Sequence, residues 1–388
     1  VQMSGLRFVT AGESHGAALT AILEGLPAGL VIARADIDDA LARRQRGYGR
    51  GDRMKIETDR VAVLSGLRFG ETLGSPITLQ VVNHDFANWT ERMDPFGDPA
   101  GSKVTAVRPG HADLTGVLKY DRDDARDILE RSSARETTMR VAVGAVCRQL
   151  LAAVGVTVIS HVTEIGGVSV DRAAIRDEDI GVTNSDDLNC CDSAAEIQMK
   201  ARIDEAQAAG DTLGGVVEVI ATDVPIGLGT HVEADRRLDA RLAAALMGIQ
   251  AVKGVEIGDG FAQAALLGSA AHDEIVRGED GHLTRTTNHA GGIEGGTSNG
   301  APIVARAGFK PISTVPRALR SVDLATGGEA VGLHQRSDTC QVVPGAVIAE
   351  AEVALVLADA LFDHAGGRSV AEMRRNLDSY RQVVGERA

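Results

Sequence analysis

The chain has 388 residues, of which 44% are hydrophobic, and its 40 basic and 54 acidic side chains give a formal net charge of −14. A net negative charge repels nucleic-acid backbones, and one tryptophan, three tyrosines and seven phenylalanines offer few rings on which bases could stack. These numbers disfavour a nucleic-acid-binding protein and favour a globular protein with an aliphatic core, which a chain of this length can bury without cross-links.

Patterns of apolar residues predict a mixture of strands and helices. Alternating or β-branched runs bounded by glycine or proline indicate strands, and apolar residues at helical spacing with capping residues indicate helices. In chain order the predicted elements are strand 7–11, helix 36–45, strands 61–66 and 77–82, helix 133–154, strand 156–167, helix 195–210, strand 214–225, and helices 235–249 and 344–367. Strand runs followed by long helices predict an α+β or mixed α/β fold.

The chain is predicted to form a single domain over residues 1–388, because no Pro- or Ser-rich linker divides it. Segments 83–104 and 176–193 are expected to be surface excursions. No run of about 18 apolar residues indicates a membrane span, and residues 1–10 do not have the pattern of a secretion signal. We therefore expect a cytoplasmic protein.

The four cysteines are not spaced as metal ligands. They are Cys147, the neighbours Cys190 and Cys191, and Cys340, and none has the C-x2-C spacing of a zinc site. We expect reduced thiols and no bound metal.

An arginine-rich segment, ARRQRGYGRGDR, follows the first predicted helix. It contains Arg43, Arg44, Arg46, Arg50 and Arg53. The first two could simply end the helix, and the whole segment could be an RNA-binding arm, although it has one tyrosine and no repeats. A small polyanionic substrate fits best, because guanidinium groups bind carboxylates and phosphates in bidentate fashion and the glycines permit close approach.

Two histidines lie in glycine-containing turns. TAGESHG places Ser14 and His15 between glycines after a strand, and RPGHAD places Arg108 and His111 about a Pro-Gly turn. Such turns expose side chains to a ligand, although a loop histidine is often only solvated. Both histidines are candidate acid–base groups.

The LERSSARET segment combines a helix start with arginines. Ser133 and Glu136 have the spacing of a capping box, and Arg131 and Arg135 lie on either side of Ser133. The free N–H groups of a helix N-terminus bind anions, although a capping box also occurs without any ligand.

Two further polar segments lie in the C-terminal half. NHAGGIEGGTSNG has neither the Walker spacing nor a G-x-G-x-x-G motif, which disfavours a P-loop or a Rossmann site. The following GFKPISTVPR, with Lys310, Ser313 and Thr314, suits a phosphate-bearing ligand. In LHQRSDTC, Arg336 and Asp338 could be a structural ion pair, or both could reach one ligand from an extended segment.

Taken together, these motifs resemble those of the chorismate synthase family. The matching pieces are TAGESHG, RRQRGYGRG, RPGHAD, RSSARET, GDTLGG, MGIQAVKGVEIGDGF, GGIEGGTSNG, KPISTVP and HQRSD, in family order between residues 10 and 338. The resemblance implies a single compact β-α-β sandwich domain and a homotetramer. It also implies an anti-1,4-elimination of phosphate from 5-enolpyruvylshikimate 3-phosphate, which requires reduced FMN without net redox change.

The resemblance further implies a role for each matched residue. The residues that would line the flavin are Arg131, Ser132, Ser133, Gln250, Ala251, Gly295, Lys310, Pro311, Ile312, Ser313, Thr314 and Arg336. The arginines that would bind the phosphate and carboxylates of the substrate are Arg44, Arg50, Arg53, Arg108 and Arg135.

The implied catalytic groups are two histidines and an aspartate. His15 would protonate the departing phosphate, His111 would protonate the reduced flavin, and Asp338 would help to relay the C6 proton. Ser14 and Ser133 would support them by hydrogen bonds. Leu114, where the family often has tyrosine, and the unmatched segment 83–104 are departures from the pattern.

Two other classes stay open at this point. Another FMN-dependent oxidoreductase would turn over NAD(P)H with an acceptor, and an RNA-binding protein would show salt-dependent affinity for RNA. The sequence also leaves open whether this chain reduces its own flavin with NADPH.

Overall fold

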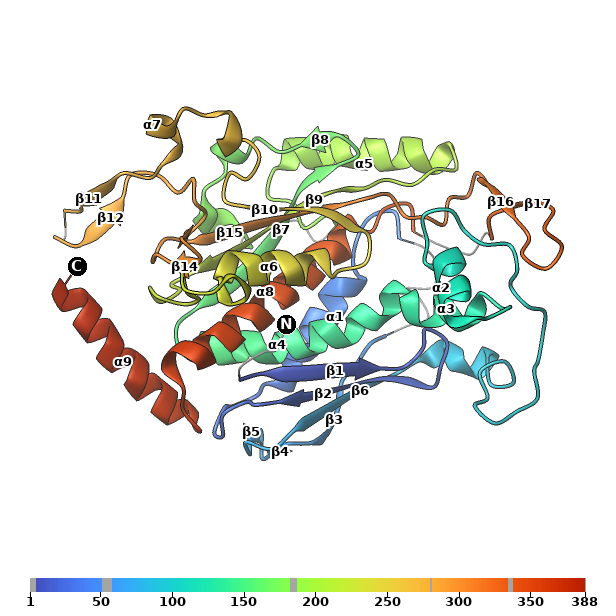
Figure 1. The fold of residues 1–388 in the computed structure, drawn as a ribbon, viewed down its shortest axis with the longest axis horizontal. Coiled ribbons are helices and arrows are strands. Elements are labelled where there is room, and N and C mark those ends of the chain that lie inside the picture. Colours follow the sequence, from blue (N-terminus) through green and yellow to red (C-terminus); the bar gives the residue numbers. More distant parts are fainter. Residues whose placement is uncertain (1–4, 51–57, 182–186, 280, 334–337, 388) are drawn as a thin grey trace.

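The computed structural model describes residues 5–50, 58–181, 187–279, 281–333 and 338–387. Two antiparallel sheets lie on either side of a set of long helices (Figure 1). The mixture of helices and strands predicted from the sequence is therefore confirmed.

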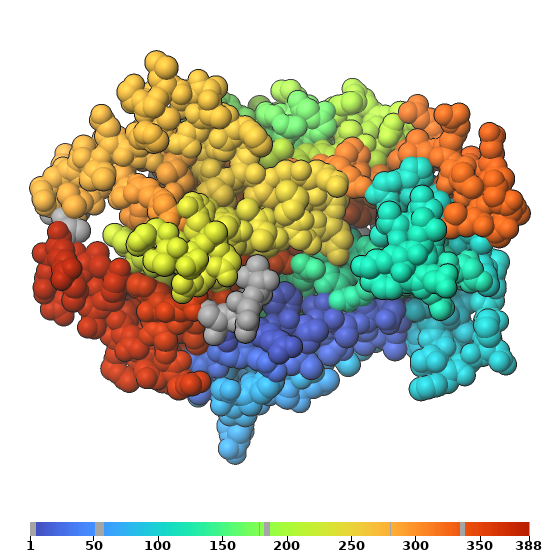
Figure 2. Space-filling view, in the orientation of Figure 1, coloured from blue at the N-terminus to red at the C-terminus, as the bar shows by residue number. Residues whose placement is uncertain are grey.

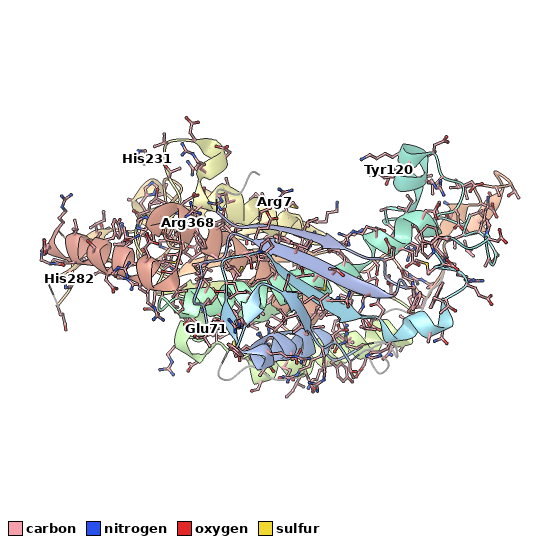
Figure 3. All side chains as sticks on the ribbon, turned by 90° about the horizontal axis from the view of Figure 1, so that it is seen from below. Arg7, Glu71, Tyr120, His231, His282 and Arg368 are labelled. Atoms are coloured by element: carbon pink, nitrogen blue, oxygen red, sulfur yellow. The ribbon has the colours of Figure 1, made fainter. Side chains whose placement is uncertain are left out.

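The first sheet has four antiparallel strands. Its order is β1 (Arg7–Ala11), β2 (Ala18–Glu24), β6 (Ile77–Val82) and β3 (Ala62–Ser65). One face, which includes Leu19, Leu23 and Leu79, is buried against helices, whereas Val9 and Val82 on the other face are more than half exposed. Figure 3 views this second face, with Arg7 and Glu71 labelled on the same side of the molecule.

The second sheet has five antiparallel strands. Its order is β10 (Val252–Ile257), β15 (Ile303–Phe309), β9 (Gly215–Thr222), β7 (Thr157–Ile165) and β8 (Val168–Ser169). In β9, Val217 and Val219 belong to the main core, while Glu218 and Ile220 point to the opposite face. The period of two thus separates an apolar inner face from an outer face that carries charge.

Three helices fill the space between the sheets. They are α1 (Arg34–Gln45), α4 (Thr137–Ala152) and α8 (Val342–Ala365). Helix α8 packs on β7 and β9, α4 packs on β2 and β6, and the two helices pack on each other. Because α8 touches neighbours on every side, residues 342–361 are all buried.

The other elements surround these layers. The helices are η2 (His84–Asn88), α2 (Asp113–Tyr120), α3 (Arg126–Ser132), η3 (Ala134–Glu136), η4 (Arg172–Ala174), η5 (Asp177–Asp179), α5 (Ser193–Ala208), η6 (Ala234–Arg236), α6 (Leu238–Met247), η7 (Gln263–Ala265), α7 (Gly268–Ala271) and α9 (Val370–Arg387). The strands are β4 (Leu67–Arg68), β5 (Glu71–Thr72), β11 (Ile275–Arg277), β12 (Leu283–Arg285), β13 (Ile293–Glu294), β14 (Thr297–Ser298), β16 (Arg320–Val322) and β17 (Glu329–Val331). No described helix is long and apolar enough to cross a membrane.

The predicted helix 133–154 is wrong at its start. Ser133 follows α3 and caps a separate 3-10 turn, accepting a bond from the Arg135 amide at 3.3 Å. The Glu136 carboxylate is not bonded to the Ser133 amide; it accepts hydrogen bonds from Thr10 and Arg140 instead. The capping box therefore does not form, and the α-helix begins at Thr137.

We predict that the contact between α4 and α8 is sensitive to added volume at Gly144. A Cβ atom there would lie 2.4 Å from the Cβ and 2.6 Å from the Cα of Ala351 on α8, and backbone atoms cannot move aside cheaply. Gly144→Ala should lower the free energy of unfolding by about 1 to 3 kcal/mol in urea titrations. The control is Gly385→Ala in α9, where the new methyl group meets no atom within 4 Å. Equal stability of the two variants would contradict this packing.

Candidate active site

A cavity of about 430 Å³ lies near the N-terminal ends of α4 and α8. Figure 2 shows the surface hollowed between the α2–α3 segment and the neighbouring yellow and orange segments. The cavity is lined by residues from separate parts of the chain, namely 14, 15, 44, 50, 108, 110–112, 129, 132–135, 137, 249–251, 309–314, 338, 341, 344, 345 and 348.

The cavity brings together most of the residues predicted from the sequence. They are Ser14, His15, Arg44, Arg50, Arg108, His111, Ser132, Ser133, Arg135, Gln250, Ala251, Lys310, Pro311, Ile312, Ser313, Thr314 and Asp338. Segments more than 300 residues apart in the chain thus meet at one site, as the predicted common ligand requires.

Two predicted flavin residues do not line this cavity. The Arg131 guanidinium instead donates to the carbonyl oxygens of Thr10 and Gly12, so its charge is directed to the end of β1. Gly295 is exposed in the β13–β14 turn, where its φ of 58° serves the turn. Arg53 and Arg336 lie outside the described residues.

His15 is held by a carboxylate that the sequence analysis missed. Its backbone N–H donates to Glu130 Oε2 at 2.8 Å, and its Nδ1 lies 2.9 Å from Glu130 Oε1. Burial would raise the pKa of Glu130, but the bonds from His15 and Arg126 outweigh it and lower that pKa. An ionised Glu130 therefore fixes the ring through Nδ1 and leaves Nε2 for a ligand.

One face of the His15 imidazole ring is covered by the only tryptophan of the chain. Trp89 stacks on His15 with ring centroids 4.0 Å apart and an interplanar angle of 32°, and Arg126 lies 4.8 Å from the centre of the indole ring. Trp89 belongs to segment 83–104, which the motif comparison left unmatched. The sequence feature that could have pointed to Trp89 is that it is a single large aromatic residue in an otherwise polar surface segment.

His111 and Arg108 share a second buried carboxylate. Asp113 Oδ1 lies 2.5 Å from His111 Nδ1, and Asp113 Oδ2 accepts from Arg108 Nε at 2.8 Å. Arg108 also donates to Thr314 Oγ1 at 3.1 Å. Burial would raise the pKa of Asp113, but hydrogen bonds from the histidine and the arginine hold it far below its usual range.

Arg44 and Arg135 meet at a third carboxylate. Asp59 Oδ2 accepts from Arg135 Nη1 at 2.7 Å and lies 3.9 Å from Arg44 Nη1. Burial lowers the pKa of Arg44 to about 9; Asp59 opposes this effect, and the charges of Arg135 and Arg50 add to it. The guanidinium still carries its charge at neutral pH, so two buried cations share one anion and a ligand with negative charge would be stabilised beside them.

Arg50 pairs with Asp338 across the cavity. Its Nη1 lies 3.0 Å from Asp338 Oδ2, and each side chain is only 11% exposed. Asp338 is the one acidic side chain among the described lining residues. The partner expected from the sequence, Arg336, lies outside the described residues, so the pair seen here joins two motifs that are distant in the chain.

Part of the cavity lining is apolar and forms what is called the apolar wall below. Leu129, Ile249, Phe309, Pro311 and Ile348 give the apolar surface. The polar groups are those of Gln250, Ala251, Lys310 and the hydroxyls of residues 313–314. The buried Gln250 Oε1 has no hydrogen-bond partner among the described residues, although its amide nitrogen donates to Glu136. A flat ring with N–H groups and a phosphate tail would match this wall.

The GDTLGG motif positions this wall without lining it. Thr212 Oγ1 donates to the Ile312 carbonyl at 2.8 Å. A Cβ at Gly214 would lie 2.2 Å from the Phe309 carbonyl oxygen, so only glycine allows the two segments to approach. This explains a matched motif to which sequence reasoning gave no role.

Comparison with known proteins agrees with this geometry. The family model described as chorismate synthase matches residues 6–362. The chain belongs to the chorismate synthase family. A chorismate synthase of Beutenbergia cavernae is 55% identical over 98% of this chain and 99% of its own length, and one of Mycobacterium avium is 54% identical over 98% of this chain and 98% of its own length. A crystal structure of a chorismate synthase superposes with a TM-score of 0.79 at 39% identity, covering 99% of this chain and 100% of that chain.

Chorismate synthases use a reduced flavin, and the cavity fits one. The apolar wall, the unpaired Gln250 oxygen and the Lys310 ammonium group are the partners that an isoalloxazine ring and a phosphate require. By contrast, no cluster of described His, Cys, Asp and Glu side chains could hold a metal ion.

We predict that Asp113 stabilises the protein only while it is ionised. Because its folded pKa is depressed, its contribution is present above the unfolded pKa of about 3.9 and decreases as pH falls below that value. Asp113→Asn should lower the free energy of unfolding by about 3 to 5 kcal/mol at pH 7, since Arg108 and His111 lose a buried partner.

Urea titrations at pH 7, 5, 4 and 3.5 would measure this contribution. The difference in free energy of unfolding between the original protein and Asp113→Asn should be the same at pH 7 and pH 5. It should become smaller at pH 4 and smaller again at pH 3.5. The exposed Asp123→Asn, whose carboxylate also pairs with a cation, is the matched control and should show a much smaller gap. A gap for Asp113→Asn that does not change with pH would contradict the assignment.

Proposed function

We propose that the chain converts 5-enolpyruvylshikimate 3-phosphate to chorismate and phosphate by an anti-1,4-elimination, with reduced FMN as cofactor. As a member of its family the enzyme is a carbon–oxygen lyase. The observation that carries the proposal is a single cavity in which four arginines and two histidines surround one acidic side chain. Such a site is suited to a substrate with one phosphate and two carboxylates.

The arginines would bind and neutralise the anionic substrate. Arg44, Arg50, Arg108 and Arg135 are nearly buried, so each charge–charge interaction with a ligand is screened less than it would be in water. Three of them, Arg44, Arg108 and Arg135, are held by Asp59 or Asp113 and need little reorganisation on binding. A phosphate whose charge is neutralised in this way leaves carbon more easily.

His15 would protonate the departing phosphate. Its Nδ1 is fixed on Glu130 and its ring on Trp89, which leaves Nε2 directed at a ligand. Histidine is the side chain that most often acts as a general acid in enzymes. Ser14 would add a hydrogen bond beside it.

Asp338 would receive the proton that leaves C6. Arg50 at 3.0 Å orients its carboxylate, and Gln341 Nε2 lies 3.4 Å from the same oxygen. Carboxylates accept protons readily from a carbon acid only when held within reach of it, so this orientation is the contribution of Arg50.

The flavin would lie against the apolar wall. Ser132, Ser133, Gln250, Ala251 and residues 310–314 would hold it, and His111, oriented by Asp113, would exchange a proton with it. When bound, reduced flavin supplies the transient electron density that lets the allylic C–O bond break without net oxidation. FMN is proposed because Lys310 and the neighbouring hydroxyls suit a single terminal phosphate.

The architecture is proposed to be that of the family, one β-α-β sandwich domain assembled as a homotetramer in the cytoplasm. The layers in Figure 1 support the sandwich. The outer face of the four-stranded sheet supports assembly, because Val9, Ile22 and Val82 are 56%, 39% and 54% exposed on it. Four free cysteines are consistent with a reducing compartment.

The reaction is tested by following phosphate release without oxygen. Purified protein, 5-enolpyruvylshikimate 3-phosphate and photoreduced FMN should yield chorismate and phosphate in equal amounts while the flavin stays reduced. Flavin oxidation in step with turnover would instead indicate an oxidoreductase and overturn the proposal. In a separate assay with oxidised FMN in place of photoreduced FMN, consumption of NADPH would measure whether the chain reduces its own flavin.

We predict that Asp338→Asn separates binding from chemistry. The variant keeps the shape of the side chain but loses its basicity, so FMN and substrate should still bind while single-turnover rates fall by about 10² to 10⁴. Asp123→Asn, at an exposed residue outside the cavity, is the control and should keep normal rates. Normal turnover with a lowered melting temperature in Asp338→Asn would show that the pair with Arg50 is only structural.

A further inference from the structure

A row of polar side chains crosses the outer face of the five-stranded sheet, away from the cavity wall. His161 on β7 is the register partner of Glu218 on β9, and Glu218 is the register partner of Arg306 on β15. His161 Nε2 lies 3.1 Å from Glu218 Oε1, and Arg306 Nε lies 3.3 Å from Glu218 Oε2. Cys191 stands at the open end of this row.

The geometry fixes which nitrogen of His161 faces the cysteine. A carboxylate only accepts hydrogen bonds, so Nε2 carries the hydrogen that points to Glu218. The unprotonated Nδ1 then faces Cys191 Sγ at 3.3 Å. His161 is fully buried, so water does not compete with Cys191 for this nitrogen. A thiol, an imidazole and a carboxylate are therefore aligned in the order used by cysteine nucleophiles.

The charges around the row keep Glu218 ionised. Burial would raise its pKa, but the bond from His161 and the charge of Arg172 lower it. The cysteine itself is different, because burial raises the pKa of the Cys191 thiol despite the nearby charge of Arg172. The thiol thus keeps its proton at rest, and the imidazole beside it is held from its other nitrogen by Glu218.

The remaining cysteines do not share this environment. Cys147, Cys190 and Cys340 are each no more than 2% exposed, and burial raises the pKa of Cys190 and Cys340 to about 11. Cys190 donates its hydrogen to the Asp192 carbonyl at 3.5 Å. Cys191 is partly exposed, at the edge of a small apolar cluster formed by Ile180, Ile220 and Val304.

We propose that Cys191 is a reactive site for low-molecular-weight disulfides, with His161 as its general base and Glu218 as the group that positions the base. As the sulfur attacks, the S–H proton passes to Nδ1, the disulfide bond of the small molecule breaks, and a new S–S bond forms to Cys191. The departing thiolate takes the proton from the imidazolium and leaves as a thiol. Cys191 is oxidised, one sulfur of the small disulfide is reduced, and no further oxidant is needed.

The test is the rate of modification of the full-length protein. Oxidised glutathione should add one glutathionyl group, which peptide mapping should place on Cys191. In the unaltered protein the rate should level off near neutral pH, because a built-in base removes the need for thiolate formed by solvent. Two results would overturn the proposal. One is a modification rate that rises about tenfold per pH unit until the pH reaches the ordinary pKa of a free thiol, about 8.5. The other is a glutathionyl group on another cysteine.

Two variants separate the base from the thiol. His161→Gln should slow modification at pH 7 by about tenfold or more and approach the original rate at high pH. Cys190→Ser, next in the chain, is the matched control and should change neither the rate nor the site. Equal rates for His161→Gln and the original protein at pH 7 would remove His161 from the reaction. Iodoacetamide, which is neutral, should show the same order of rates.

Discussion

A site for a multiply charged anion must hold several cations together before the anion arrives. In this chain the cost is limited by buried carboxylates that belong to the protein and not to the ligand. Asp59 lies between Arg44 and Arg135, Asp113 joins Arg108 to His111, and Glu130 holds His15. Each carboxylate orients the side chains that it contacts, and Asp59, which lies between two arginines, leaves one positive charge in excess beside the cavity.

The same arrangement supports the fold around helix α8. This helix is buried along almost its whole length, yet three of its buried side chains are acidic. Glu350 accepts from both terminal nitrogens of Arg43, Glu352 pairs with Arg140 at 3.0 Å, and Asp359 accepts from the Leu6 amide. The central helix is thereby tied to α1, α4 and the first strand. Because α8 begins just after Asp338, these ties also hold the wall of the cavity.

Local sequence patterns predicted elements and motifs better than they predicted partners. Strand 77–82 and helix 195–210 could be predicted because the spacing of apolar residues within each segment indicates its type. Strand β10 and helix α9 were missed, because their apolar residues are few or interrupted by glycine and charge.

Side-chain partners were harder to predict than elements. Ser133 and Glu136 have capping-box spacing, but the Glu136 carboxylate bonds to Thr10 and Arg140 instead of the Ser133 amide. Arg131 and Gly295 match family motifs, but neither residue lines the cavity in this structure. The Arg131 side chain bonds to the end of β1, and Gly295 lies in the β13–β14 turn. Trp89, Glu130 and Asp59 could not be assigned from the sequence, since their roles arise only when distant segments meet.

The position of Trp89 has an optical consequence. The chain contains no other tryptophan, so its ultraviolet-excited indole emission arises from one ring, and that ring lies 4.0 Å from the imidazole of His15. Indole emission responds to the charge of a group stacked on it. The protein therefore carries a native fluorophore whose intensity reports the protonation of a single histidine, and the filling of the space beside it, without any label.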